Sequence, residues 1–308
     1  MSPSELSLLP KLFWVVVSVV GAIAYGLVIG GIIRKVMARI QGRIGPPVYQ
    51  PYLDLFKVIF QRTATWHGYM FFLGPVFRAA GAIGLFLLIP VVFGDPRFDN
   101  FSFNGDLLMV MYFMFFGCLG MALGAAEGGH PHSVVAITRG LSQMTAYELP
   151  FSLAVVAIAA QTGSFSVHQI VAAQQGGVGH WFLFTNPLAA VAAFLAFLGM
   201  NMYSPFDIVL APQEIPIGPP TEYNSAFMSA MMSGRAIFGV AKCVLYMDLF
   251  LGGATTILAA IVKVFFIYFW SIFVGAVFPR FRTEQAVRFF LGWPTAAGVA
   301  AVLAVMLF

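Results

Sequence analysis

Several charged side chains interrupt or follow the long apolar runs of this sequence, and they are its strongest candidates for chemistry. Glu148 follows Gln143 and Tyr147 and precedes several apolar turns. A carboxylate at membrane depth is costly, and it is therefore a functional candidate by default. In such surroundings Glu148 could accept and release protons. The other charged candidates are Glu127, Asp207, Glu214, Glu222, Asp248 and Lys263.

Some of these charges have an alternative, structural explanation. Asp248 could be a solvated charge at the outer end of its apolar run, and Glu127 could be a simple helix-end charge. Lys263 could pair with a carboxylate only to satisfy burial. Glu148 is harder to explain in this way because several apolar turns follow it.

The motifs of most enzymes and metal sites are absent from the sequence. Cys118 and Cys243 lie inside apolar runs without a partner at metal-binding spacing. His130 and His132 flank Pro131, and we expect a surface turn there because a metal would need more ligands. No phosphate-binding loop, G-x-S-x-G, H-E-x-x-H or Rossmann glycine pattern occurs. We therefore expect no catalytic residue, no metal and no cofactor held by this chain.

The composition requires lipid as the solvent for much of the surface. Of the 308 residues, 60% are hydrophobic and 9% are charged, whereas a soluble domain carries about 25% charged residues. The net charge of +4 does not indicate nucleic acid, because the basic residues follow the expected membrane topology and form no stripe with interleaved aromatic residues.

Apolar stretches of membrane-spanning length recur along the chain. A membrane helix needs about 20 mostly apolar residues, and Gly- and Pro-rich breakers separate the stretches. We predict an all-α polytopic membrane protein, a single integral membrane domain over residues 1–308 with about eight transmembrane helices. The predicted spans are Leu12–Ile33, Gly74–Phe93, Leu107–Ala126, Leu141–Ala160, Pro187–Tyr203, Ala236–Gly252, Thr256–Phe278 and Leu291–Phe308.

Basic residues are sorted between the two sides of the predicted spans. Most of them fall after the odd-numbered spans, and the positive-inside rule then predicts that these loops are cytoplasmic and that both termini lie outside. The predicted cytoplasmic loops cover residues 34–78, 127–147, 204–235 and 279–290. The first contains an amphipathic stretch, Tyr52–Phe60, which we expect to form a surface helix. Loops of this length indicate a docked partner.

Four segments, in register with the predicted spans, resemble one family. They are Ala38–Pro47 with Gln50–Ile59, Ala136–Glu148, Ser204–Tyr223 and Lys263–Arg288. Their order and motifs, such as Gln41-Gly42-Arg43 and Ser204-Pro205-Phe206-Asp207, are similar to the membrane subunit shared by respiratory complex I (its H subunit, or subunit 1) and the complex-I-related membrane-bound nickel–iron hydrogenases.

The resemblance implies a place at the junction of a hydrophilic redox arm and an ion-pumping membrane arm. It implies nickel–iron and iron–sulfur centres in hydrophilic partner subunits, antiporter-like membrane neighbours, and a prokaryotic plasma (inner) membrane. By matching position, Glu148, Asp207, Glu214 and Glu222 would belong to the ion-coupling path, with Arg139 and Lys263 as counter-charges. The residues expected to dock the redox arm are Arg39, Arg43, Arg280 and Arg282.

Departures from the family pattern help to decide between its two branches, complex I and the membrane-bound hydrogenases. Leu210 and Pro212 stand where the family often has further glutamates, which thins the acidic entrance to the path. Parts of Pro212–Pro220 resemble the hydrogenase branch, whereas Gln143–Glu148 and Arg280–Gln285 resemble complex I. We expect the hydrogenase type. Three alternatives stay open: the quinone-chamber H subunit of an NADH:quinone oxidoreductase, a stand-alone secondary transporter, and a passive anchor.

Overall fold

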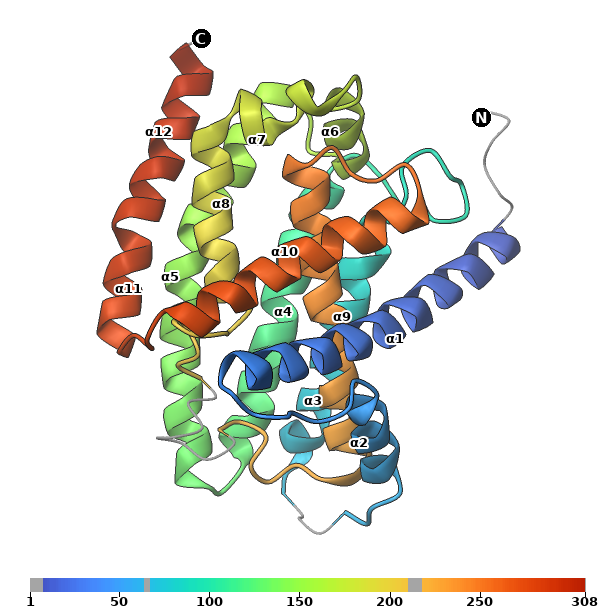
Figure 1. Cartoon of the computed structure of the whole chain (residues 1–308), viewed down its shortest axis with the longest axis vertical. Helices are drawn as coiled ribbons and strands as arrows, with labels where there is room; N and C mark the ends of the chain where they lie inside the picture. The colour runs from blue at the N-terminus through green and yellow to red at the C-terminus, as the bar shows by residue number, and fades with distance from the viewer. Residues whose placement is uncertain (1–7, 64–66, 210–217, 308) are drawn as a thin grey trace.

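The computed structural model describes residues 8–63, 67–209 and 218–307, and every regular element in these ranges is a helix. This confirms the predicted all-α class. Figure 1 shows the helices as a bundle in which α1 and α10 cross obliquely over α9. The helices are α1 (Leu8–Ile40), α2 (Gln50–Ile59), α3 (Tyr69–Leu87), α4 (Asp106–Glu127), α5 (Pro131–Thr162), α6 (Val167–Ala173), the short 3-10 turn η1 (Val178–His180), α7 (Phe182–Thr185), α8 (Pro187–Met200), α9 (Ser225–Phe250), α10 (Ile257–Val277), α11 (Thr283–Leu291) and α12 (Trp293–Leu307).

Seven stretches of the described chain are long and apolar enough to cross a membrane. They correspond to seven of the eight predicted spans. The remaining one, predicted over Pro187–Tyr203, is α8, and it has 14 helical residues. At 1.5 Å per residue α8 is about 21 Å long, shorter than a hydrocarbon core of about 30 Å.

The helix α5 begins ten residues before the start predicted at Leu141. Pro131 occupies its first turn, where a missing N–H has no cost, and His130 Nδ1 accepts a hydrogen bond from the N–H of His132 at 3.3 Å. The first part of α5 is less apolar than the rest, so a search for apolar runs misses it. Because the helix begins at Pro131, Arg139 lies within it and Glu148 lies near its middle.

Two glycine pairs let α3 and α4 approach each other closely. A Cβ on Gly81 would lie 2.6 Å from the Cα of Gly117, and a Cβ on Gly74 would lie 2.7 Å from the Cα of Gly124. Side chains are thus excluded at both contacts, as is common where membrane helices pack backbone to backbone.

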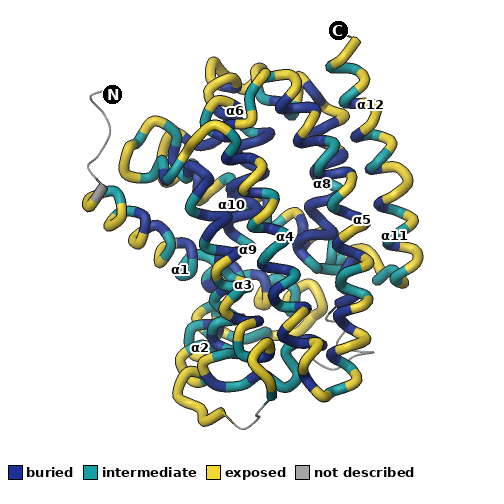
Figure 2. The backbone as a smooth tube through the Cα atoms, turned by 180° about the vertical axis from the view of Figure 1, so that it is seen from behind, coloured by how far each residue is buried: buried dark blue, intermediate teal, exposed yellow. Residues whose placement is uncertain are grey.

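Burial divides the helices into an inner and an outer group. In the apolar 18-residue stretch of each membrane-length helix, 61% of the residues are buried in α5 and α9, compared with 28% in α1 and α10 and 22% in α11–α12. Figure 2 shows the exposed residues along the outward faces of α1 and α12. The outer faces of these helices are therefore available to lipid or to neighbouring subunits.

The predicted surface helix within the first long loop is confirmed as α2. Its residue Asp54 accepts hydrogen bonds from Arg34 at 3.2 Å and from Gln50 at 2.8 Å. The Tyr52 hydroxyl donates to the carbonyl oxygen of Ala24. These contacts attach α2 to α1 at the end of the molecule where α3 and α9 begin (Figure 1).

Candidate functional site

Two of the predicted carboxylates, Glu127 and Glu222, lie together at the N-terminus of α3. The backbone N–H of Phe71 donates to Glu127 Oε2 at 2.5 Å, and Glu222 Oε2 lies 3.2 Å from His67 Nε2. The positive end of a helix dipole favours a carboxylate at this position. Glu127, at the end of α4, therefore stabilises the start of a different helix, α3.

Tyr223 lies between these two carboxylates. Its hydroxyl donates to the carbonyl oxygen of Phe71 at 2.9 Å, and its ring stacks on the Phe71 ring with centroids 4.2 Å apart. Burial, and then the charges of Glu127 and Glu222, raise the pKa of Tyr223. The segment before α9 is thereby joined to α3 and α4.

Asp207 pairs with a residue that was expected to dock the redox arm. Its Oδ2 lies 3.4 Å from Arg280 Nη2, and both side chains are about four-fifths buried. Arg280 also lines a cavity of about 420 Å³ together with Arg139, Arg282 and Glu284. The structure thus gathers three predicted arginines around one opening beside Asp207. Arg39 and Arg43 are exposed at the end of α1 and in the following loop.

Glu148 lies apart from both groups. Its side chain is half-buried on α5, next to the exposed Leu149 and between the buried Tyr147 and Pro150. Within the residues that the structure describes, Glu148 has neither an ion-pair partner nor a side-chain hydrogen bond. A carboxyl within a membrane-length helix requires a partner or a polar environment.

Lys263 lies at the opposite end of α9 from Glu222. Its Nζ donates to the carbonyl oxygens of Leu251 at 2.8 Å and Gly253 at 2.6 Å, and it lies 4.5 Å from the centroid of the Trp181 ring. Asp248, fully buried nearby, supplies an opposite charge. Helix rise along α9 separates Asp248 by about 35 Å from Ser225, the first residue of the helix, which follows Glu222 closely. Lys263 therefore belongs to a different group from the loop carboxylates.

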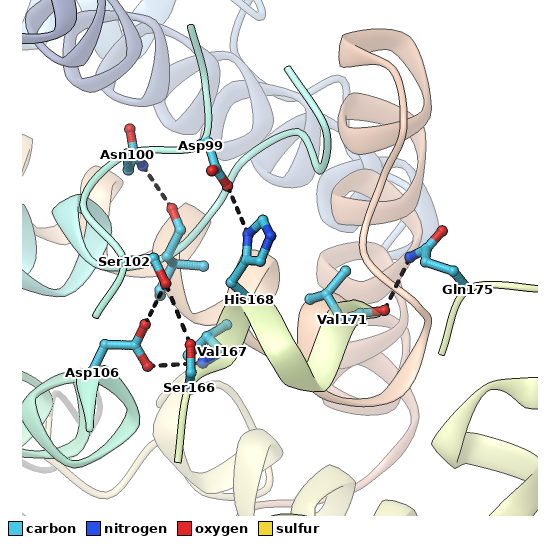
Figure 3. Close-up of polar contacts among 10 residues, drawn as sticks. Asp99, Asn100, Ser102, Asp106, Ser166, Val167, His168, Val171 and Gln175 are labelled. Atoms are coloured by element: carbon cyan, nitrogen blue, oxygen red, sulfur yellow. Dashed lines mark hydrogen bonds and ion pairs between the residues drawn. The ribbon is translucent and has the colours of Figure 1, made fainter. Parts of the chain in front are cut away.

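The loops around Lys263 contain a further polar group that the sequence did not indicate. Figure 3 shows Asp99 paired with His168, and Asp106 accepting from Ser102 and from the N–H of Val167. The Asp99–His168 distance is 3.1 Å. These contacts fasten the 94–105 loop to α6. The predicted site residue Glu214, and the departures Leu210 and Pro212, lie outside the described residues.

Sequence reasoning missed a group of three cations that line one cavity of the bundle. Arg78 and Arg235 were counted as loop charges, and Lys242 was not singled out, yet they lie in α3 and α9 and line one cavity. Their signal was available as basic residues spaced within helical apolar segments. The described part of the chain holds no group of three or more His, Cys, Asp or Glu side chains that could bind a metal ion.

The fold and these charged groups define a class: a multi-pass helical membrane subunit with polar groups at both ends and within the bundle. A family model described as NADH dehydrogenase matches residues 11–306. The chain therefore belongs to the NADH dehydrogenase family of membrane subunits.

Curated relatives agree with this assignment. The H subunit of the NADH-quinone oxidoreductase of Protochlamydia amoebophila (strain UWE25) is 29% identical over 287 residues, which cover 87% of each chain. The corresponding subunit of Bacillus thuringiensis (strain Al Hakam) is 27% identical over 305 residues, covering 92% of this chain and 87% of the relative.

A solved structure is similar over nearly the whole chain. It belongs to the membrane-bound sulfane sulfur reductase, an archaeal respiratory membrane complex. The match has a TM-score of 0.88 and 32% identity, and it covers 96% of this chain and 99% of the other. This chain is accordingly a membrane subunit of a multisubunit oxidoreductase complex, related to the H subunit of the quinone oxidoreductases.

Proposed function

We propose that this chain docks the hydrophilic redox arm of a complex-I-related oxidoreductase of the membrane-bound hydrogenase type, and couples its electron transfer to proton or sodium translocation. The observation that carries the proposal is Glu148, a half-buried carboxyl within a membrane-length helix that has no ion-pair partner among the described residues. Such a group is positioned to change protonation when the field around it changes.

Basic residues support the docking part of the proposal. Arg139, Arg280 and Arg282 line the cavity beside Asp207, while Arg39 and Arg43 are exposed near α2. Basic clusters of this kind steer and orient an acidic partner surface. In this proposal these loops face the cytoplasm of a prokaryotic cell and both termini lie outside. Antiporter-like membrane subunits would cover the Glu148 face of α5.

The hydrogenase type rests on branch resemblance. Segments of the Pro212–Pro220 region resemble that branch. The similar solved structure, at 32% identity, belongs to a sulfane sulfur reductase and not to an NADH-quinone oxidoreductase. Nickel–iron and iron–sulfur centres would then reside in the partner subunits. The complex could have a second form with the same membrane subunits, in which the hydrophilic arm reduces sulfane sulfur, as the complex of the similar solved structure does by its name.

A quinone-chamber subunit is the second candidate function, and one cavity favours it. An apolar cavity of about 250 Å³ lies between α1, α9 and α10, lined by Ala22, Phe86, Val244 and Ile261 among others. An isoprenoid tail fits such a lining. A stand-alone transporter is disfavoured because the similar proteins are subunits of multisubunit complexes.

The test is purification of the intact complex through a tag on this chain. We expect co-purification of a large hydrophilic subunit, nickel in elemental analysis, and hydrogen production coupled to ion uptake in proteoliposomes. Sulfide release from polysulfide without nickel would move the assignment to the sulfane sulfur reductase form. Quinone reduction sensitive to quinone-site inhibitors would establish the second candidate. A monomer with transport activity would overturn all three.

A further inference from the structure

Three cations face one small cavity in the bundle. The cavity has a volume of about 120 Å³ and lies among α3, α4, α9, α10 and residues 200–202. Arg78 projects from α3, and Arg235 and Lys242 project from α9 seven residues apart, which places both on one face of that helix. No carboxylate is among the described residues that line it.

Arg78 lacks the partners that a buried guanidinium requires. Only 9% of its surface is exposed, and its Nη1 is buried without a hydrogen-bond partner in the described chain. The guanidinium carbon lies 5.6 Å from the centroid of the Phe238 ring. A guanidinium carries five N–H donors and stays charged, so an unpartnered one in the interior leaves a large desolvation cost uncompensated.

Lys242 is only partly satisfied by the protein. Its Nζ donates to the carbonyl oxygen of Met200 at 2.8 Å and lies 5.2 Å from the centroid of the same Phe238 ring. An ammonium group has three donors, so others remain for a ligand. The positive charge of Arg78 opposes that of Lys242, and Arg235 adds a third positive charge nearby.

Arg235 is the outermost of the three cations and the one that has counter-groups. Its residue is exposed, whereas Arg78 and Lys242 are buried. Tyr203 shares a side-chain hydrogen bond with it, and Asp207 is among the opposite charges that act on it. Among the described residues, no carboxylate is a charged group that acts on Arg78 or Lys242. The positive charge therefore remains in excess at the inner end of the cavity, where Arg78 and Lys242 flank Phe238.

We propose that this cavity binds one small anion, held by hydrogen bonds from Arg78 and Lys242 and by the charge of Arg235. The anion restores charge balance and supplies the acceptor that Arg78 Nη1 lacks. The proposal does not depend on which redox reaction the complex performs.

The rest of the lining indicates the chemical class of the anion. Apart from the three cations and the polar side chains of Asn201 and Tyr268, sulfur-bearing and apolar side chains border the cavity, including Cys118, Met121, Met228 and Met231. Thioether sulfur is polarizable, and the cavity, at about 120 Å³, has room for several water molecules or for a small anion with its remaining hydration. The polarizable lining favours a weakly hydrated, polarizable monovalent anion such as bromide or hydrosulfide over a strongly hydrated oxyanion such as phosphate or sulfate.

The test titrates the purified complex with sodium bromide against sodium gluconate at constant ionic strength. We expect a saturable rise in melting temperature, because a ligand that binds only the folded state stabilises it. Arg78→Met should raise the half-saturating bromide concentration by at least about tenfold. Arg97→Met is the matched control, since Arg97 is exposed and pairs with Asp95, and it should respond as the wild type does.

A second measurement keeps the proposal decidable if Arg78→Met does not fold. Lys242→Met is titrated in the same way, and crystals of the wild-type complex grown in bromide are examined by anomalous scattering. An anomalous peak between Arg78 and Lys242 supports the site. Absence of a peak there, or a bromide response that is unchanged in both variants, overturns it.

Discussion

The carboxylate of Glu127 at the end of α4 accepts a hydrogen bond from the backbone N–H of Phe71 in the first turn of α3, at 2.5 Å. Gly68, which precedes α3, has no room for a Cβ because the Glu127 carboxylate occupies that space. The contact joins the end of α4 to the start of α3, two helices that pack side by side and are connected in sequence by the 88–105 loop. It provides for α3 the cap that its own N-cap glycine cannot provide.

Glu127→Ala should destabilise the folded chain by about 1–2 kcal/mol, because it removes the acceptor for the first turn of α3 and the favourable charge at its N-terminus. Glu127→Gln, which retains an acceptor oxygen, should lose less. Thermal unfolding of the purified complex in detergent measures both. If Glu127→Gln is fully stable but loses coupled ion transport, Glu127 has the coupling role considered from the sequence.

Lys263→Met should destabilise the turn that connects α9 to α10. The substitution removes the donor for the carbonyl oxygens of Leu251 and Gly253, and hydrogen bonds from a charged donor contribute about 1.5–3 kcal/mol each. Faster hydrogen exchange at Gly253, whose N–H bonds to Met247, reports the local loss. Lys263→Arg keeps the charge, and equal exchange in both variants would contradict the structural role.

The sequence predicted the helical class, seven of the membrane-length helices and the α2 surface helix, because these depend on local apolar patterning. The start of α5 was missed because a surface turn was expected around Pro131, which instead occupies the first turn of this helix. The sequence also could not separate Lys263 from the loop carboxylates, because that requires knowing how the ends of α9 are placed. Arg78 and Lys242 were missed for the same reason: only packing shows that two helices direct these cations to one cavity.

Two aspartates of the 94–105 loop should respond to pH in opposite directions. Burial raises the pKa of Asp99, which pairs with His168. A raised folded-state pKa gives a stability contribution that is present at low pH and lost as the pH rises through it. Asp99→Asn removes this loss, so the stability of this variant relative to wild type should improve as the pH rises from acidic to neutral values.

Asp95 is the matched control with the opposite sign. Hydrogen bonds from Arg97 lower the pKa of the Asp95 carboxyl, so its contribution is present above its unfolded value and is lost as the pH falls through the lowered one. Relative to wild type, Asp95→Asn should lose stability as the pH rises, and only slightly because the pair is at the surface. Melting temperatures at several pH values measure both slopes, and slopes of the same sign contradict the assignment.

Arg280→Gln should weaken attachment of the hydrophilic arm more than Arg288→Gln does. Arg280 pairs with the partly buried Asp207 and lines the cavity next to Arg139, whereas Arg288 is exposed near the end of α11. We expect the yield of hydrophilic subunits that co-purify with this chain to fall in Arg280→Gln, and to fall further at high salt, because exposed charge contacts are screened. Equal retention in the two variants would remove Arg280 from the docking surface.

Glu148→Gln should assemble into the complex, retain electron transfer and lose coupled ion transport. Glutamine matches the size of the side chain but cannot take up or release a proton, and Glu148 has no ion pair in the described chain whose loss would unfold α5. Ion uptake per electron transferred, measured in proteoliposomes, should fall to the level of uncoupled vesicles. Asp95→Asn makes the same chemical change in a surface loop and should stay coupled. Full coupling in Glu148→Gln would show that this carboxyl only fills space on α5, and the coupling path would then have to run through the Asp207 group instead.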